Sequence, residues 1–298
     1  MQSVPVSKPE PPKNDIFLTG LDFLALELTD KCNLECVHCY ADSGPSLPMS
    51  QFMQPSDWER VIADGYDLGC RKIQFIGGEP TIYPHLAGLI RYSRSLGYEL
   101  VEVFTNGTAF TEKIKGTLKS SRVSLAFSVY ASDAAVHDSI TLRAGSFAAT
   151  INSIRWALGV GLPVHAAIVE MNQNAAGTER TKAFLSNLGV SDIRVDRARG
   201  VGRGSAGKNV VSPLNELCGN CWKGRLCVTP AGSVFPCVMS RAWCVGTAAE
   251  GIMSIVEGER LWSFRRDLKS RMECSTRACS PQCGPDCSPA QCGPQCSP

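Results

Sequence analysis

The sequence predicts an α/β fold, with a parallel sheet over most of the chain and a small cysteine-rich region after it. Six short apolar runs typical of β-strands alternate with helical patterns between residues 22 and 200. Strands separated by about 10–15 helical residues form βαβ units and pair in parallel. Beyond Gly200 the composition changes, first to glycine and then to cysteine. We therefore expect a disordered tail (1–21), a core (22–200), a cysteine-rich extension (201–273) and a cysteine-rich tail (274–298).

The elements follow from apolar periodicity and from turn residues. The expected strands are Phe23–Leu28, Lys72–Ile76, Leu100–Phe104, Ser124–Val129, Val164–Val169 and Asp192–Asp196. The expected helices are Trp58–Leu68, Tyr83–Ser95, Thr111–Lys119, Phe147–Leu158 and Gly177–Leu188. The first of them begins after the capping run Gln54–Asp57 and ends at Gly69. In the extension, Leu226–Cys237 predicts a β-hairpin that turns near Gly232.

Composition excludes several classes of protein. A formal charge of +2 over 298 residues gives no reason to expect nucleic acid or an anionic membrane as partner. No run of eighteen apolar residues predicts a membrane span, and the proline-rich start lacks the apolar stretch of a signal peptide. We therefore expect a cytoplasmic protein. In that compartment disulfides are rare, so metal clusters explain the 15 cysteines better.

Three cysteines, Cys32, Cys36 and Cys39, stand directly after the first strand with the spacing C-x3-C-x2-C. A cubane iron–sulfur cluster has four irons, each normally bound by one thiolate. Three thiolates leave one iron open, and open metal positions are typical of catalysis rather than of structure. The alternative is zinc with His38 as fourth ligand. Zinc sites usually bring a second ligand pair about 12–20 residues on, whereas the next cysteine is Cys70.

Polar and glycine residues follow the ends of the other strands. They are Gly77, Gly78, Glu79, Pro80, Thr105, Asn106, Ser128, Asp196 and Arg199. Sites in α/β barrels lie at the C-terminal ends of the strands, so these residues predict one shared site with the cysteine loop. Glycines let the backbone approach a ligand closely, and Glu79 can accept a hydrogen bond from an ammonium group. Ordinary turn chemistry is the alternative, above all for Asn106-Gly107.

With Asn33 and the run His38-Cys39-Tyr40, the cysteine loop closely resembles the signature of radical S-adenosylmethionine (SAM) enzymes. The resemblance implies a partial (β/α)6 TIM-type barrel, with a [4Fe–4S] cluster on the three cysteines and SAM on the open iron. His38 would lie along the adenine, and Gly77–Pro80 would hold the SAM amine. Thr105, Asn106 and Ser128 would bind the methionine carboxylate or the ribose, and Ile168 would pack on the adenine.

The resemblance also implies a reaction. A reduced cluster passes one electron to the sulfonium of SAM, giving methionine and a 5′-deoxyadenosyl radical that removes a hydrogen atom from the substrate. An electron donor such as flavodoxin or ferredoxin would supply the electron. The sequence identifies no catalytic acid or base; Asp196 and Arg199 are candidates for contact with substrate or SAM. His137, Asp138 and Arg143 are interpreted as structural, and Cys70 as a buried thiol.

A second cysteine group, Cys218-x2-Cys221-x5-Cys227-x9-Cys237, resembles the SPASM or twitch extensions of peptide-maturing radical SAM enzymes. It implies one or two auxiliary [4Fe–4S] clusters. The tail cysteines Cys279, Cys283 and Cys287 are further candidate ligands, although they depart from the usual SPASM order. A structural zinc site is the alternative, because C-x2-C pairs are typical of zinc.

The substrate rests on family analogy alone. A ribosomally made precursor peptide is expected, modified by cross-linking, thioether formation or oxidation. Little chain precedes Phe23, so leader recognition would need a separate partner protein. The alternative is a dehydrogenase or epimerase of a small molecule such as an aminocyclitol or sugar. A non-catalytic iron–sulfur or zinc protein is the alternative from another class, and it predicts closed four-cysteine sites throughout.

Overall fold

The computed structural model describes residues 20–49, 52–206 and 213–277. Its strands are β1 (Phe23–Glu27), β2 (Lys72–Ile76), β3 (Leu100–Thr105), β4 (Ser124–Ser128), β5 (Val164–Glu170), β6 (Asp192–Arg197), β7 (Arg225–Val228), β8 (Ser233–Phe235) and β9 (Gly246–Thr247). Its helices are α2 (Pro55–Asp67), α3 (Leu86–Leu96), α4 (Glu112–Ser120), α5 (Ala134–Thr141), α6 (Ser146–Gly159), α7 (Thr178–Asn187), α8 (Ile252–Val256) and α9 (Glu259–Arg277).

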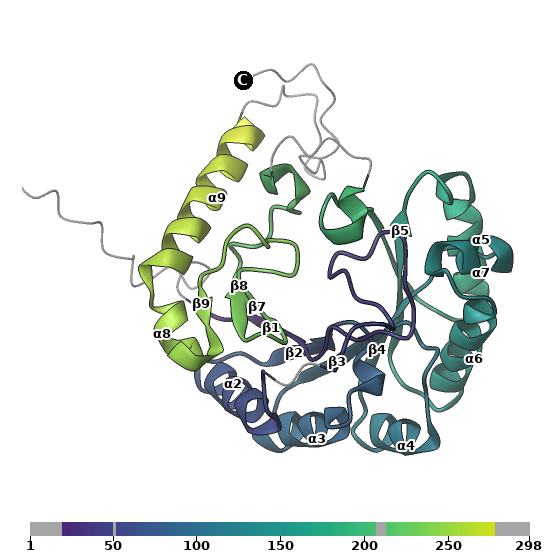
Figure 1. The fold of residues 1–298 in the computed structure, drawn as a ribbon, viewed down its shortest axis with the longest axis horizontal. Coiled ribbons are helices and arrows are strands. Elements are labelled where there is room, and N and C mark those ends of the chain that lie inside the picture. The colour runs from purple at the N-terminus through teal and green to yellow at the C-terminus, as the bar shows by residue number, and fades with distance from the viewer. Residues whose placement is uncertain (1–19, 50–51, 207–212, 278–298) are drawn as a thin grey trace, which may run out of the picture.

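The strands form one curved sheet in the order β6-β5-β4-β3-β2-β1-β7-β8-β9. Strands β1 to β6 pair in parallel with their neighbours, which confirms the predicted α/β architecture. The helices form an arc on the outer face of the sheet, and the purple loop after β1 lies on the inner face (Figure 1). The sheet does not close, because β6 and β9 are its two edges. This is a partial barrel.

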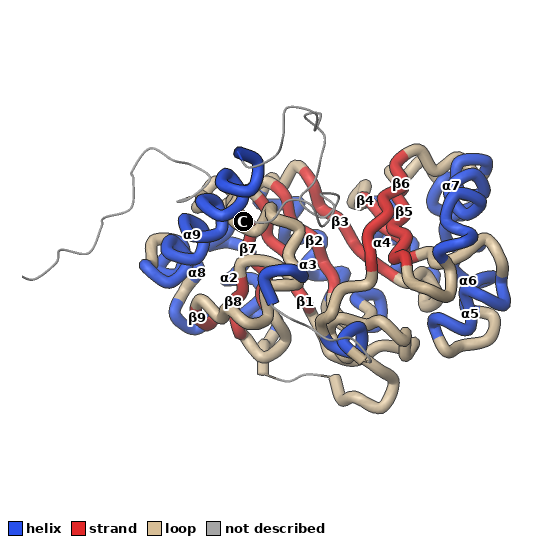
Figure 2. Tube along the Cα trace, turned by 90° about the horizontal axis from the view of Figure 1, so that it is seen from above, coloured by secondary structure: helices blue, strands red, loops and turns tan. Residues whose placement is uncertain are grey.

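The extension continues the same sheet. Strand β7 pairs in parallel with β1, with Cys227 opposite Ala25, and β7 and β8 form the predicted hairpin. At this end of the sheet lie α8 and α9, whereas α7 lies at the other end beside β6 (Figure 2). Helix α9 runs to Arg277 and so crosses the expected boundary at residue 273. Cys279, Cys283 and Cys287 lie outside the described residues.

Side chains alternate between the two faces of the sheet. On β3, Val101 and Val103 are fully buried in the main apolar core between sheet and helices. Between them Glu102 points into the barrel, where it pairs with His165 of β5 and accepts a hydrogen bond from Gln74 of β2. The outer face of the barrel is therefore apolar, and its interior carries charge.

Helices α5, α8 and α9 were not predicted. Helix α5 begins at the cap Asp133, whose carboxylate accepts from the Val136 amide at 3.0 Å, and ends at Leu142 with φ 55°. It is only 8 residues long, so it offers little periodicity. No helix in the described part of the chain has the length and apolar character needed to cross a bilayer.

Candidate functional site

The three cysteines of the loop after β1 line one cavity of about 270 Å³, at the C-terminal ends of the strands. Most of the residues predicted from strand ends line it too: His38, Gly77, Gly78, Thr105, Asn106, Ser128, Ile168, Asp196 and Arg199. Its volume is close to the range of small-molecule pockets, about 300–1,000 Å³. The predicted shared site is thus a real concave feature.

The environment of Cys32 and Cys36 disfavours loss of the thiol proton unless a cation is close by. Burial is the largest influence on Cys32 and Cys36, and it raises the pKa of each thiol to about 12. Thiolates are nevertheless the form that binds metal. Coordination to iron supplies the positive charge that would make ionisation favourable, so the donor set fits the cluster that the sequence predicts.

Gly77 and Gly78 bring the loop after β2 against the cysteine loop. The Gly78 amide donates to the Thr29 carbonyl at 2.6 Å, and the Glu79 amide donates to the Lys31 carbonyl at 3.0 Å. A Cβ on Gly78 would lie 2.1 Å from the Lys31 oxygen. No side chain fits there, so glycine is required for contact between the two loops.

The Glu79 side chain is committed to contacts within the protein. Its side chain is fully buried and, with Pro80, is absent from the cavity lining. The carboxylate accepts hydrogen bonds from Thr81, from the Thr105 hydroxyl at 2.6 Å and from the Asn106 amide at 2.8 Å. Burial nevertheless raises its pKa. Glu79 therefore joins the ends of β2 and β3 through its carboxylate.

Asn106 links the third strand to the cysteine loop. Its amide nitrogen donates to Asn33 at 2.8 Å and lies 3.8 Å from the Cys32 sulfur. Asn33 in turn donates to Thr108 at 2.8 Å. The predicted Asn106-Gly107 turn therefore does more than reverse the chain, because its side chain holds the residue next to Cys32.

On the opposite wall, His38 packs edge-on against Tyr130, with ring centroids 4.7 Å apart. The Tyr130 hydroxyl lies 4.0 Å from the Cys36 sulfur, a contact that the sequence did not indicate. Ile168 lines the cavity but is also 1 % exposed and part of the main core. It is as much a core residue as a cavity residue.

Asp196, near the end of β6, and Arg199, just after it, form an ion pair in the cavity wall. Two buried polar atoms of this lining, Ser43 Oγ and Arg199 Nε, have no hydrogen-bond partner in the described part of the chain. Buried polar atoms are normally satisfied. Their position fits a polar ligand in the cavity, as SAM is.

In the extension, Cys221 and Cys237 have sulfurs 2.7 Å apart. Hydrogen bonding to Cys221 lowers the pKa of Cys218 to about 5 and that of Cys237 to about 7. Cys227 is separate, because it is buried with Ala25 and Ile76 inside the barrel. No three Cys, His, Asp or Glu side chains of the described residues converge on a single-ion position; a cubane cluster binds its thiolates farther apart, each on a different iron.

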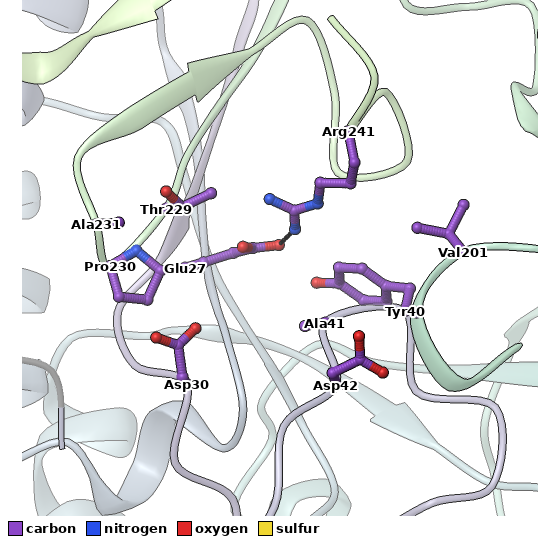
Figure 3. A pocket seen from close by; sticks show the side chains of 11 residues that line it. Glu27, Asp30, Tyr40, Ala41, Asp42, Val201, Thr229, Pro230, Ala231 and Arg241 are labelled. Atoms are coloured by element: carbon purple, nitrogen blue, oxygen red, sulfur yellow. Dashed lines mark hydrogen bonds and ion pairs between the residues drawn. The ribbon is translucent and has the colours of Figure 1, made fainter. Parts of the chain in front are cut away.

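A second cavity of about 350 Å³ lies between the cysteine loop and the extension. Figure 3 shows the Arg241 guanidinium against the Glu27 carboxylate, with the Tyr40 ring beside them and Asp30 and Asp42 across the cavity. Burial raises the pKa of Glu27, while Arg241 and Tyr40 act against it. This ion pair joins β1 of the core to the extension, and no spacing in the sequence predicts it.

Replacing Arg241 with methionine should lower the free energy of unfolding by about 3–5 kcal/mol, because Glu27 would be left charged and buried. Urea unfolding measures the effect. The control is Lys182→Met at the exposed pair with Glu179, where about 0.5 kcal/mol is expected. A cost at Arg241 no larger than that of the control would contradict the assignment.

His137 and Asp138 are structural, as predicted. The Asp138 carboxylate accepts from the Gly145 amide at 2.6 Å, the Ser146 hydroxyl at 2.8 Å and the Phe147 amide at 2.8 Å, so it caps the start of α6. Burial is the largest single influence and opposes ionisation, but the hydrogen bonds together lower the pKa of Asp138. His137 is buried, which lowers its pKa to about 4.

Asp138→Ala should lower the free energy of unfolding by about 1–2 kcal/mol through loss of the cap, with ligand binding unchanged. Because the folded pKa of Asp138 is depressed, its contribution is present above the unfolded pKa of about 3.9. It is lost as the pH falls through the lower folded pKa. Urea unfolding at pH 7 and pH 3 tests both points; an equal difference between wild type and variant at the two pH values would contradict them.

Sequence comparison finds relatives with several different activities. The chain is 25% identical over 252 residues to the antilisterial bacteriocin subtilosin biosynthesis protein AlbA of Bacillus subtilis, covering 72% of this chain and 54% of AlbA. It is 30% identical over 158 residues to a GTP 3′,8-cyclase of Desulforamulus reducens, covering 52% of this chain and 48% of the cyclase. The chain thus spans about half the length of the curated relatives it matches.

Structural comparison matches the fold. The crystal structure of Streptococcus suis SuiB bound to S-adenosylmethionine superposes with a TM-score of 0.69 at 14% identity, covering 83% of this chain and 68% of SuiB. SuiB has also been solved with its precursor peptide SuiA. The family model of the radical SAM superfamily matches residues 26–185, the stretch that holds all three loop cysteines and strands β2 to β5. The chain therefore belongs to the radical SAM superfamily.

Proposed function

We propose that this radical SAM enzyme removes a hydrogen atom from a ribosomally made peptide, leading to a cross-link, a thioether or an oxidised residue. The observation that carries the proposal is that two groups of cysteines lie beside neighbouring strands of the same sheet. Cys32, Cys36 and Cys39 line the cavity at the end of β1, and Cys218, Cys221 and Cys237 gather beside β7, which pairs with β1. The similarity to AlbA, a bacteriocin biosynthesis protein, supports a peptide substrate.

In this proposal the core is residues 22–200 and the auxiliary-cluster extension 201–273. Cys32, Cys36 and Cys39 hold the first [4Fe–4S] cluster. When bound, this cluster and SAM supply reductive cleavage of SAM and removal of a substrate hydrogen atom. Cys218, Cys221 and Cys237 hold an auxiliary cluster, with Cys227 nearby; the tail cysteines, the electron donor, the leader-binding partner and the cytoplasmic location stay predictions.

The chain's own residues position SAM and shield it from water. The backbone of Gly77 and Gly78 receives the amine, and Asn106 fixes the loop beside Cys32. The buried Tyr130 ring and the half-buried His38 ring packed against it would shield the adenine side from water. Asp196 and Arg199, an ion pair in the cavity lining, would contact substrate or SAM. Exclusion of water protects a reactive species from side reactions.

A small-molecule substrate is the second candidate, and the similarity to GTP 3′,8-cyclase favours it. The cavity of about 270 Å³ has the size of a small-ligand pocket, so its volume alone does not choose between the two.

The test is release of 5′-deoxyadenosine by anaerobically reconstituted protein with dithionite and SAM. Precursor peptides encoded beside the gene are compared with a scrambled peptide of equal composition and with GTP. We expect faster release and a mass change in the peptide only with a true precursor. Stimulation and modification with GTP or another small molecule, and none with any peptide, would reject the peptide proposal and favour the second candidate.

A further inference from the structure

In the segment after β6, Arg203 forms several hydrogen bonds to the cysteine loop. Arg203 donates from Nε to the Cys36 carbonyl at 2.9 Å and from Nη2 to the Ser43 carbonyl at 2.6 Å. Its own amide donates to the Cys39 carbonyl at 3.0 Å. These contacts span 160 residues or more of sequence. One residue therefore fixes the second and third cysteines and the end of their loop together.

The glycines on either side of Arg203 make this contact possible. A Cβ on Gly202 would lie 2.5 Å from the Cys39 oxygen, and one on Gly204 would lie 2.2 Å from the Arg199 oxygen. Gly202 also has φ 55°, in the left-handed region that glycine adopts without strain. The run Gly202-Arg203-Gly204 is thus shaped to lie flat against the cysteine loop.

The start of the same segment is anchored to the extension. The Gly200 amide donates to the Glu216 carboxylate at 2.7 Å, and Arg197 pairs with that carboxylate at 3.0 Å. Arg199 donates to the Glu216 carbonyl at 3.2 Å. Glu216 stands two positions before Cys218. The segment therefore ties the cysteine loop to the chain that leads into the second cysteine group.

Arg203 also brings charge. No carboxylate in the described part of the chain forms an ion pair with it, because both its side-chain hydrogen bonds go to carbonyls. Its side chain is half-buried, where a charge is less screened than at the surface. The guanidinium thus places a positive charge directly against the backbone of the loop that carries Cys36 and Cys39.

We propose that Arg203 is a positioning residue that holds Cys36 and Cys39 for the cluster and whose charge raises the reduction potential of that cluster. The inference rests on the proposed cofactor site. Reduction adds one negative charge to the cluster, and a fixed positive charge nearby stabilises the reduced form. Outer partners of metal ligands tune potential and affinity in this way.

The experiment is an EPR-monitored redox titration of the SAM-binding cluster in wild type, Arg203→Gln and Arg203→Lys. The matched control is Arg143→Gln. It also loses a hydrogen bond to the cysteine loop, from Arg143 to the Asn33 carbonyl at 3.1 Å. The charge that it removes is exposed, however, and is therefore screened by salt. At a fixed potential we expect the ratio of reduced to oxidised cluster to fall ~10-fold in Arg203→Gln, equal to about 59 mV for one electron. Lysine retains the charge, so Arg203→Lys should stay near wild type in potential while holding less iron.

A wild-type potential in Arg203→Gln would overturn the inference while leaving the cofactor site intact. If Arg203→Gln holds too little cluster to titrate, Arg203→Lys decides, and a full ~10-fold shift there would overturn the role of charge. Wild-type protein with no cluster on the loop cysteines would overturn the proposed function itself, and this inference with it.

Discussion

Alanine at any one of Cys32, Cys36 or Cys39 is expected to abolish loading of the SAM-binding cluster and formation of 5′-deoxyadenosine. All three side chains line one cavity, and a cubane cluster with only two thiolates loses a direct ligand. Loss of an outer partner alone typically costs 10–100-fold in metal affinity, so losing a ligand should cost more than about 100-fold. Iron and sulfide content and the rate of 5′-deoxyadenosine release measure the effect.

The control for these variants is Cys70→Ala. Cys70 is fully buried, and its thiol donates to the Lys72 carbonyl at 3.2 Å, outside the cavity lining. It should lose a little stability and keep both the cluster and activity. Because auxiliary clusters would also contain iron, total iron content does not report on the SAM-binding cluster alone. The variants are therefore compared by the EPR signal that changes when SAM is added. A Cys36→Ala protein with an undiminished signal of this kind would contradict the assignment.

Gly78→Ala carries the second large effect. The added Cβ would lie 2.1 Å from the Lys31 oxygen and 2.9 Å from the Asp30 oxygen, both backbone atoms that cannot rotate away. The two loops must separate, at an overpacking cost of about 1–3 kcal/mol. Because this contact forms one wall of the cavity, SAM affinity should fall at least ~10-fold, the factor that corresponds to about 1.4 kcal/mol. Equilibrium binding of SAM to reconstituted protein measures it.

The matched control is Gly116→Ala on α4. Nothing lies within 4 Å of the Cβ position there, and alanine in a helix is about 1 kcal/mol more favourable than glycine. This variant should be as stable as wild type or more stable, with unchanged SAM affinity. Equal SAM affinities in the Gly78 and Gly116 variants would show that the Gly78 contact does not shape the cavity.

Local sequence signals predicted most of the fold. The strand and helix positions follow from apolar periodicity and caps, and the cavity residues follow from one rule about the ends of parallel strands. Apart from helices α5, α8 and α9, what was missed depends on contacts distant in sequence. The pairing of β7 with β1, the Glu27–Arg241 ion pair and the grip of Arg203 on the cysteine loop join segments that no spacing relates.

Glu79 shows the same limit in a different way. Its motif predicted a place in the site but did not predict which groups would bind its carboxylate. The donors are the Thr105 hydroxyl and the Asn106 amide at the end of β3, and the Thr81 amide of its own turn. For Glu102, a charged residue in an otherwise apolar strand was a usable signal that it points into the barrel.

The most direct test of the central claim is the EPR spectrum of the reduced, reconstituted protein before and after addition of SAM. Three loop cysteines leave one iron open, so SAM should bind that iron and change the g-values of the signal. The change should be absent in the Cys32/Cys36/Cys39→Ala triple variant. A fully loaded wild-type protein whose spectrum is the same with and without SAM would contradict an open cluster and favour a closed, non-catalytic site.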